Sequence, residues 1–283
     1  MKHFLFVLFL GINSSLFSQL ISGKVIDEST KKTIPFVSVG IKGTNIGTLS
    51  DDNGFFKINI EKALQTDSFK ISAIGYKSKT YSSIEVQSFS DQQIYLQPEN
   101  YILKEVTIHP TKRKQKVLGN KRYNKRGYCS FKSKAQGTQI AVKIENEKNR
   151  SLTIEDFNFC LNVNAFGDSI IFRLNFYASD ANGLPGKSLL KKQIVFSPNP
   201  NIGIIKLDLK NESIIIDEKI FFVSIECISD LTKNQHKTGY SPTEIGFSGS
   251  PKGPVYVNES SQGNWQKKPV AGVDFNVTVS YQK

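Results

Sequence analysis

Histidines and cysteines, the residues most often used in metal sites, are scarce in this 283-residue chain, which has three of each. A zinc peptidase needs two histidines and a carboxylate around a metal that keeps one position open for water. Besides His3, the chain has only His109, which precedes Pro110, and His236, which lies in a polar segment. No metal-binding spacing joins them, so we interpret both as surface residues and predict no metal site.

Serine and carboxylate chemistry also lacks its usual spacing. Gly246-Phe247-Ser248-Gly249 has no residue between serine and glycine, unlike the Gly-x-Ser-x-Gly turn of serine hydrolases. Glu155-Asp156 could form a glycosidase pair, but adjacent charges at the start of a strand are more typical of a solvated position. Asp51-Asp52-Asn53-Gly54 has oxygens suited to calcium but no distal glutamate, and it is interpreted as a turn. The sequence therefore predicts a protein that is not an enzyme, with no catalytic residues and no cofactor.

An aromatic and polar cluster near the C-terminus is the candidate for ligand binding. It runs from Pro254 to Trp265, the only tryptophan, and includes Tyr256, while Tyr240 is near it in sequence. Such rings beside Asn, Gln and Glu could stack on a sugar and hydrogen-bond its hydroxyls. The competing interpretation is that the rings pack the protein's own core, because they supply large buried area. We favour burial for Trp265.

The N-terminus has the pattern of a cleavable signal peptide over residues 1–18. Lys2 and His3 precede an apolar run from Phe4 to Leu10, and Ser18 is a small residue suited to cleavage before Gln19. That run is too short to span a bilayer, and no later segment approaches about 18 apolar residues. We expect export to the periplasm, the outer-membrane surface or the medium, with no transmembrane segment in the mature chain.

A strongly basic stretch lies between Pro110 and Lys134 and contains no Asp or Glu. Its ten lysines and arginines supply most of the chain's net charge of +12. Because we expect export, nucleic acid is not a predicted partner despite this charge. We interpret the stretch as a solvated linker; the second interpretation is contact with anionic lipid or lipopolysaccharide phosphates. The residues for that contact are Lys112, Arg113, Lys114, Lys116, Lys121, Arg122, Lys125 and Arg126.

Alternating apolar residues indicate many short strands in two regions, 19–98 and 138–283. Segment 99–137 between them is assigned to a last strand and the basic linker. We predict an all-β protein of two β-sandwich domains, the second jelly-roll-like. The alternating segments are 37–41, 56–60, 69–73 and 94–96 in the first region and 140–144, 157–163, 172–176, 221–225 and 275–279 in the second.

The three cysteines, Cys129, Cys160 and Cys227, are an odd set, so at least one is outside any intramolecular disulfide. A bond between Cys160 and Cys227 is open in an oxidising envelope. We favour buried thiols that act as small hydrophobes.

The stretch from Ile21 to Tyr76 resembles a known family. The resemblance rests on Ile21-Ser22-Gly23-Lys24-Val25-Ile26-Asp27, the segment 34–44, the segment 47–56 and Ile74-Gly75-Tyr76. These segments are similar to the carboxypeptidase regulatory-like domain, a transthyretin-like β-sandwich on exported proteins of Bacteroidetes-type bacteria. The resemblance covers about residues 20–97 and implies a module without catalytic residues.

The same family module also precedes TonB-dependent receptors, but the rest of this chain is too short for such a barrel, so we exclude a transporter. The C-terminal half, through 172–177, 183–186 and 259–265, resembles exported bacterial proteins with the same two-part layout.

These observations favour a non-catalytic exported binding or scaffolding protein of the bacterial cell envelope. The alternative is a glycan-binding accessory protein of a polysaccharide-uptake system. The predicted partner is accordingly an envelope protein or a glycan, with possible contact to anionic lipid or lipopolysaccharide.

Overall fold

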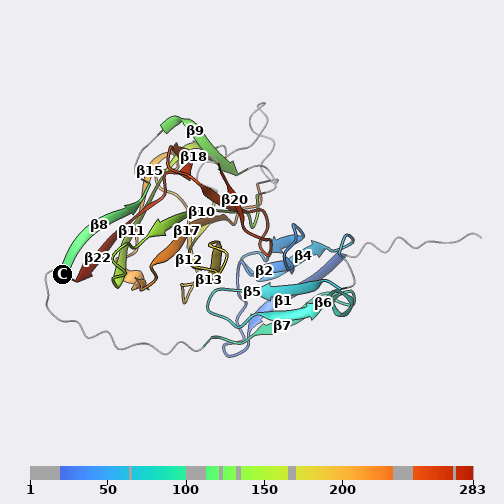
Figure 1. Ribbon diagram of the computed structural model, residues 1–283. Helices are drawn as coiled ribbons and strands as arrows, with labels where there is room; N and C mark the ends of the chain where they lie inside the picture. The colour runs from blue at the N-terminus through green and yellow to red at the C-terminus, as the bar shows by residue number, and fades with distance from the viewer. Residues whose placement is uncertain are drawn as a thin grey trace, which may run out of the picture.

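The computed structural model describes residues 20–63, 66–99, 113–120, 124–131, 135–164, 170–231, 245–269 and 272–282, with the backbone alone for 124–128. Nearly all of the regular structure is β-strand, arranged in two adjoining lobes (Figure 1). The predicted all-β class with stacked sheets is confirmed. The predicted signal peptide lies outside the described residues.

The N-terminal domain packs a three-stranded sheet against a four-stranded sheet. The first sheet has the order β4-β1-β7, with β1 (Leu20–Asp27), β4 (Phe55–Asn59) and β7 (Gln92–Leu96). The second has the order β3-β2-β5-β6, with β2 (Ser38–Ile41), β3 (Gly47–Leu49), β5 (Ser68–Ser72) and β6 (Lys79–Ser82), which leads into the one-turn helix α1 (Ser83–Val86). Alternate residues fill the shared core, as predicted, and include Val39, Ile41, Phe56, Ile58, Phe69, Ile71 and Ile94.

The turn between β3 and β4 is held by the Asp51 side chain. One carboxylate oxygen accepts hydrogen bonds from the backbone N–H groups of Asn53 at 2.9 Å and Phe55 at 2.8 Å. Gly54 has a φ of 78°, a conformation that favours glycine. The segment is a tight turn, as predicted.

The C-terminal domain packs two larger sheets. One follows the order β13-β12-β17-β10-β19-β20, with β14 added on β12; we call it the seven-stranded sheet. Its strands are β10 (Gln139–Glu145), β12 (Phe172–Ser179), β13 (Pro185–Ser188), β14 (Ile194–Phe196), β17 (Ile220–Cys227), β19 (Val255–Asn258) and β20 (Gln266–Lys268).

The eight-stranded sheet follows the order β21-β18-β11-β22-β8, with β15 and β16 on β11 and β9 on β18. Its strands are β8 (Arg113–Gly119), β9 (Asn124–Phe131), β11 (Leu152–Asn164), β15 (Gly203–Asp208), β16 (Ile215–Ile216), β18 (Ile245–Ser250), β21 (Gly272–Val273) and β22 (Asn276–Gln282), with a 3-10 turn at Lys210–Glu212. The core between the sheets contains a continuous group of aromatic rings: Phe157, Phe159, Phe172, Phe247 and Phe275.

The basic stretch forms two strands where the structure describes it, so the linker prediction is wrong for those residues. Strand β8 pairs with β22 from Gly119 opposite Asn276 to Arg113 opposite Gln282, and β9 pairs with β18. The physical reason is that β8 ends its sheet, where its charges stay in water while Leu118 packs on the core. Charges on an edge strand also discourage pairing with other chains.

All three cysteines are thiols, and no disulfide joins Cys160 to Cys227. Cys160 belongs to β11 in one sheet and Cys227 to β17 in the other. Burial raises the pKa of the Cys227 and Cys129 thiols, which keeps them protonated and unreactive. The preference for buried thiols agrees with the burial of Cys160 and Cys227.

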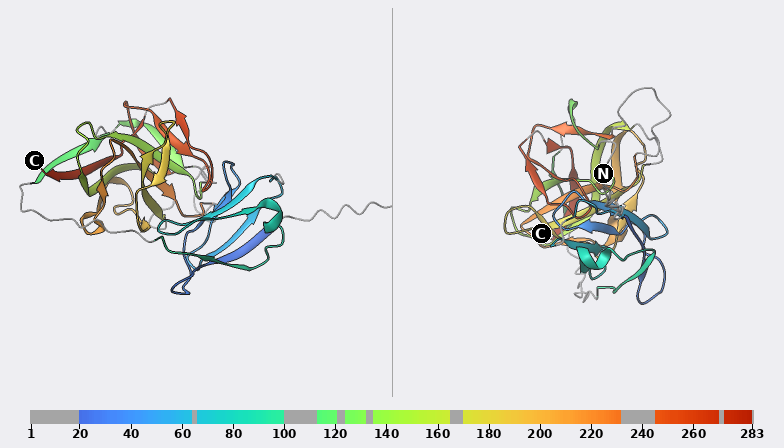
Figure 2. Two further views of the ribbon diagram at one scale, coloured as in Figure 1. Left: turned by 60° about the horizontal axis from the view of Figure 1, so that its bottom comes forward. Right: turned by 90° about the vertical axis from the view of Figure 1, so that its right-hand side faces the viewer.

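The two domains meet over the outer face of the four-stranded sheet and the outer face of the seven-stranded sheet (Figure 2). Strand β12 shows how this arises: Phe172, Leu174 and Phe176 enter the core, so the alternate residues face outwards. Those outward residues, Arg173 and Asn175, are nevertheless buried, because the N-terminal domain and neighbouring strands cover them.

Candidate ligand-binding cavity between the domains

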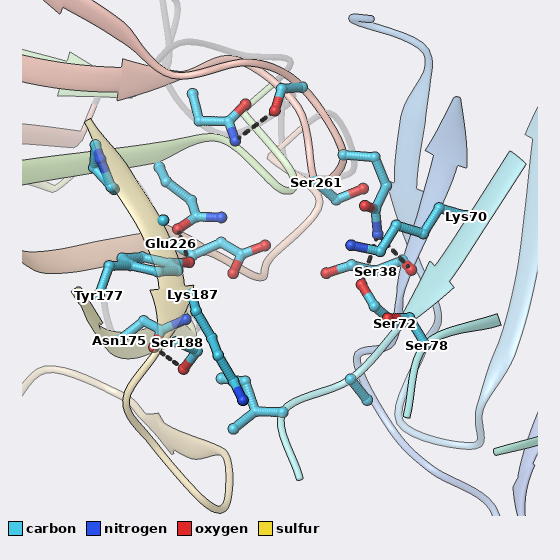
Figure 3. Close-up of a pocket in the computed structure, with 18 of the residues that line it drawn as sticks. Ser38, Lys70, Ser72, Ser78, Asn175, Tyr177, Lys187, Ser188, Glu226 and Ser261 are labelled. Carbon is cyan, nitrogen blue, oxygen red and sulfur yellow. Dashed lines mark hydrogen bonds between the residues drawn. The ribbon is translucent and has the colours of Figure 1, made fainter. Parts of the chain in front are cut away.

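A cavity of about 400 Å³ lies between the two sheet faces and is lined by both domains. Figure 3 shows its walls, with β5 on one side and β12 on the other. Most of the lining side chains carry hydrogen-bonding groups. From the N-terminal domain they include Ser38, Lys42, Lys70, Ser72 and Ser78, and from the C-terminal domain Gln139, Arg173, Asn175, Tyr177, Lys187, Ser188, Glu226, Gln262, Asn264 and Trp265.

Sheet register places four polar side chains in one row beneath the cavity. Arg173 on β12 is opposite Glu226 on β17, Glu226 is opposite Gln139 on β10, and Gln139 is opposite Asn258 on β19. Directly opposite residues on neighbouring strands share a face, so the row is continuous across four strands. All four residues line the cavity and are at least nine-tenths buried.

Arg173 holds the row to the N-terminal domain. Its Nε and Nη2 donate to Glu226 Oε2 at 2.9 and 2.7 Å, an ion pair whose side chains are 3% and 2% exposed. Its Nη1 donates to the backbone oxygen of Phe36 at 2.6 Å and to Gln193 Oε1 at 2.8 Å, and Nη2 also reaches Ser38 Oγ at 3.2 Å. One guanidinium therefore uses its fixed fork of donors to join two domains.

The second contact between the domains joins two segments that are far apart in the sequence. The loop 259–264, between β19 and β20, lies on the hairpin formed by β2 and β3. Ser260 Oγ donates to the backbone oxygen of Thr44 at 2.9 Å, and Ser261 Oγ donates to that of Thr48 at 2.8 Å. Gln262 Nε2 donates to the backbone oxygen of Ser38 at 3.0 Å. We call these contacts the hairpin–loop contact.

Glu226 has one carboxylate oxygen that is committed to Arg173 and one that is not. Oε1 is buried and, among the described residues, has no hydrogen-bond partner. Burial raises the pKa of the Glu226 carboxyl, and the Arg173 guanidinium opposes that shift. A buried acceptor without a donor is costly, so this oxygen would be stabilised by any hydroxyl or amide donor that reached it.

The rest of the C-terminal wall is an ordered polar network. Tyr177 Oη donates to Gln139 Oε1 at 2.7 Å, and Ser188 Oγ donates to Asn175 Oδ1 at 2.7 Å. Burial raises the pKa of Tyr177 above its ordinary value of 10.0, so the phenol stays a donor. These side chains are held in place before any ligand arrives, which lowers the entropy cost of binding.

Trp265 is half-buried at the cavity and packs edge-on against Tyr177, with ring centroids 5.5 Å apart. The sequence favoured burial of Trp265, whereas the structure places it in the cavity wall with part of its surface open. Tyr256 is only 3% exposed and packs edge-on against Phe222, so its ring is not a ligand platform. Tyr240 lies outside the described residues.

The other predicted residues are scattered. Arg113, Lys114 and Lys116 are exposed on β8, away from the residues that line the cavity, and anionic-surface contact stays a prediction for them. Of the remaining five, Lys112, Lys121 and Arg122 lie outside the described residues, and for Lys125 and Arg126 only the backbone on β9 is described.

The residues weighed for catalysis are also placed where described. Ser248 Oγ donates to Asp274 Oδ2 at 3.3 Å in a buried position. Asp156 is 4% exposed and pairs with Lys206 at 3.1 Å, so the solvated interpretation is wrong for this carboxylate. Within the described ranges no three His, Cys, Asp or Glu residues gather as a metal site, and His109 and His236 fall outside those ranges.

Arg173, Glu226 and the two lysines of the opposite wall, Lys42 and Lys70, were not predicted as site residues from the sequence. A signal existed in 172–177, where an arginine, an asparagine and a tyrosine alternate with core residues. The second face of such a strand is polar, and another part of the protein can pack over it.

The family model for the CarboxypepD_reg-like domain matches residues 21–108. The N-terminal domain is therefore a CarboxypepD_reg-like β-sandwich, as the resemblance predicted, and the match continues past Pro98. No curated protein matches the sequence of this chain. Within the described residues, no helix has the length and apolar character needed to cross a membrane.

Several solved structures align with the chain at low similarity. A chain from the structure of infectious bursal disease virus Gx strain aligns at 10% identity, over 93% of this chain and 60% of the viral chain, with a TM-score of 0.26. The VP2 subviral particle of that virus aligns at 10% identity over 92% and 62%, with a TM-score of 0.25. The major pilin subunit of Bacillus cereus aligns at 8% identity over 90% and 68%, with a TM-score of 0.18. This chain thus spans under two thirds of the viral chains.

Proposed function

We propose that this protein is an exported, non-catalytic binding protein of the cell envelope that holds a glycan in the cavity between its domains. The observation that carries the proposal is the row of buried polar side chains beneath that cavity, which includes a Glu226 oxygen without a hydrogen-bond partner among the described residues. A sugar presents many hydroxyls at fixed spacing, and a preformed set of donors and acceptors matches such a ligand. Export is supported by the signal pattern of residues 1–18.

Trp265 supports a sugar over other polar ligands. Its indole is partly open at the cavity, beside Asn264 and Gln262. An aromatic face offers an apolar surface for the carbon-bound hydrogens of a sugar ring, while neighbouring amides can take its hydroxyls.

A pure scaffolding role receives less support from the geometry. The N-terminal domain uses the hairpin of β2 and β3 to hold its own C-terminal domain, so that surface is not open to an envelope partner. The proposal leaves the other surfaces of this protein for an envelope protein that delivers or receives the ligand.

The test is affinity electrophoresis of residues 19–283 through gels that each contain one neutral or acidic polysaccharide. We expect at least one polysaccharide to retard the wild-type protein, and Trp265→Ala to weaken that binding about tenfold or more. Tyr95→Ala, which removes an aromatic ring from β7 outside the cavity, is the matched control and should bind normally.

Trp265 also packs on Tyr177, so Trp265→Leu serves as a second variant that keeps more apolar volume. Thermal unfolding of each variant separates lost binding from lost fold. Undiminished binding by both Trp265 variants, or no retardation of the wild type by any polysaccharide, would overturn the proposal.

A further inference from the structure

The charged residues that line the cavity do not balance. Arg173 is paired with Glu226 on the C-terminal wall, and Lys187 lies 3.5 Å from Glu99 at the rim. The lining lysines left over are Lys42 and Lys70, both on the N-terminal wall. Among the described residues, neither has a carboxylate within ion-pair distance.

Sheet register explains why these two lysines lie together. Lys70 on β5 is opposite Gly40 on β2, and Lys42 follows Gly40 by two residues, so both ammonium groups belong to the outer face of the four-stranded sheet. Figure 3 shows Lys70 extending from β5 towards the cavity, beside Ser38 and Ser72. The pair therefore forms a cationic patch with hydroxyl groups next to it.

The lysine pair is unfavourable without a ligand. Lys70 is partly buried, and burial together with the nearby Lys42 ammonium lowers the pKa of Lys70. Lys42 is exposed, so the cost arises at the partly buried Lys70, which the like charge of Lys42 repels. An anion between the two ammonium groups would remove that repulsion and gain charge-assisted hydrogen bonds.

We propose that Lys42 and Lys70 form a carboxylate subsite, so that the ligand is an acidic glycan containing uronic acid residues. This inference rests on the proposed function, because it assigns the chemical class of the glycan in the same cavity. The carboxylate lies against the lysine wall, and the sugar hydroxyls face Glu226, Asn175 and Ser188 on the opposite wall.

The arrangement also explains how an anion is accepted beside Glu226. The charge of Glu226 is matched by Arg173 at 2.7 Å, so the C-terminal wall is close to neutral and presents acceptors. The N-terminal wall presents the positive charge. A ligand with its acid on one side and hydroxyls on the other is complementary to this polarity.

The experiment compares oligosaccharides from polygalacturonate, alginate and hyaluronan with their carboxyl-reduced forms, in which each acid becomes a neutral primary alcohol. Binding to residues 19–283 is measured by isothermal titration calorimetry. We expect at least one acidic oligosaccharide to bind about tenfold or more tightly than its reduced form, and to weaken as salt rises.

Lys70→Gln keeps most of the side-chain length and removes the charge, and it should erase the preference for the acidic form. Lys57→Gln, on the opposite sheet of the same domain, is the matched control and should leave binding unchanged. Equal binding of acidic and reduced forms, an unchanged preference in Lys70→Gln, or no binding of any acidic oligosaccharide overturns the inference. A neutral glycan bound through Trp265 but independently of Lys70 would overturn it and leave the proposed function standing.

Discussion

At the scale of single residues, Arg173 is the position on which the domain junction depends most. Its donors reach Glu226 within the C-terminal domain and the backbone oxygen of Phe36 in the N-terminal domain. Arg173→Met should destabilise the protein by about 3–5 kcal/mol, because it leaves the Glu226 carboxylate buried without its counter-charge. Urea denaturation, with the free energy extrapolated to water, measures this loss.

The double variant Arg173→Met, Glu226→Met separates the effect of the lost ion pair from that of the lost hydrogen bond to Phe36. Removing both charges together should recover part of the stability, because no uncompensated carboxylate remains. Recovery should be incomplete, because the backbone oxygen of Phe36 still lacks its donor. A single variant as stable as the wild type would contradict the assigned role of the ion pair.

At the scale of elements, the hairpin–loop contact depends on a glycine. A Cβ added at Gly47 would lie 2.9 Å from Ser261 Oγ and 3.1 Å from Ser260 Oγ. Ser261 Oγ cannot move freely, because it donates to the backbone oxygen of Thr48 at 2.8 Å and lies 3.2 Å from that of Val39. Gly47→Ala should therefore cost about 1–2 kcal/mol, measured as a lower free energy of unfolding.

The matched test for Gly47 is a double-mutant cycle with Ser261→Ala. Because the cycle removes the closest oxygen, Gly47→Ala should cost less in the Ser261→Ala background than in the wild type. The same cost in both backgrounds would show that the added methyl group destabilises the hairpin itself and does not clash with Ser261 across the hairpin–loop contact.

The elements also show what a single sequence can and cannot predict. The strands around Val39, Phe69 and Phe172 were predictable because one face of each is apolar and strand periodicity is two. Strand β8 was not, because an edge strand keeps its charges in water and only Leu118 enters the core. Local alternation carries no information about such an edge.

The cavity was harder to predict for a different reason. The loop 259–264 recognises the hairpin of β2 and β3 mainly through backbone oxygens, which every residue possesses. Lys70 and Glu226 come from different domains and meet the same cavity only through the docking of two sheets. The sequence pointed to Trp265, whose residue type is informative, and missed the lysines, whose type is common at surfaces.

At the scale of the whole molecule, the two domains share a hydrogen-bonded junction. Side chains of Arg173, Gln193 and loop 259–264 donate to backbone oxygens of the N-terminal domain. Most interfaces between domains of one chain permit relative motion. Here the donors are directed at fixed carbonyl groups, so we expect the domains to keep one relative position and the cavity to keep its shape.

This junction predicts that the two domains unfold together. Each hydrogen bond contributes roughly 0.5–1.5 kcal/mol net, so several of them couple the domains by an amount comparable to the marginal stability of a small sandwich. Scanning calorimetry of residues 19–283 should show one transition whose calorimetric and van't Hoff enthalpies agree. The double variant Gly47→Ala, Arg173→Met, which weakens both contacts, should split it into two, because each domain has its own core. Two transitions already present in the wild-type protein would mean that the contacts between the domains add little stability. The domains would then move relative to each other, and the cavity between them would not be a preformed site.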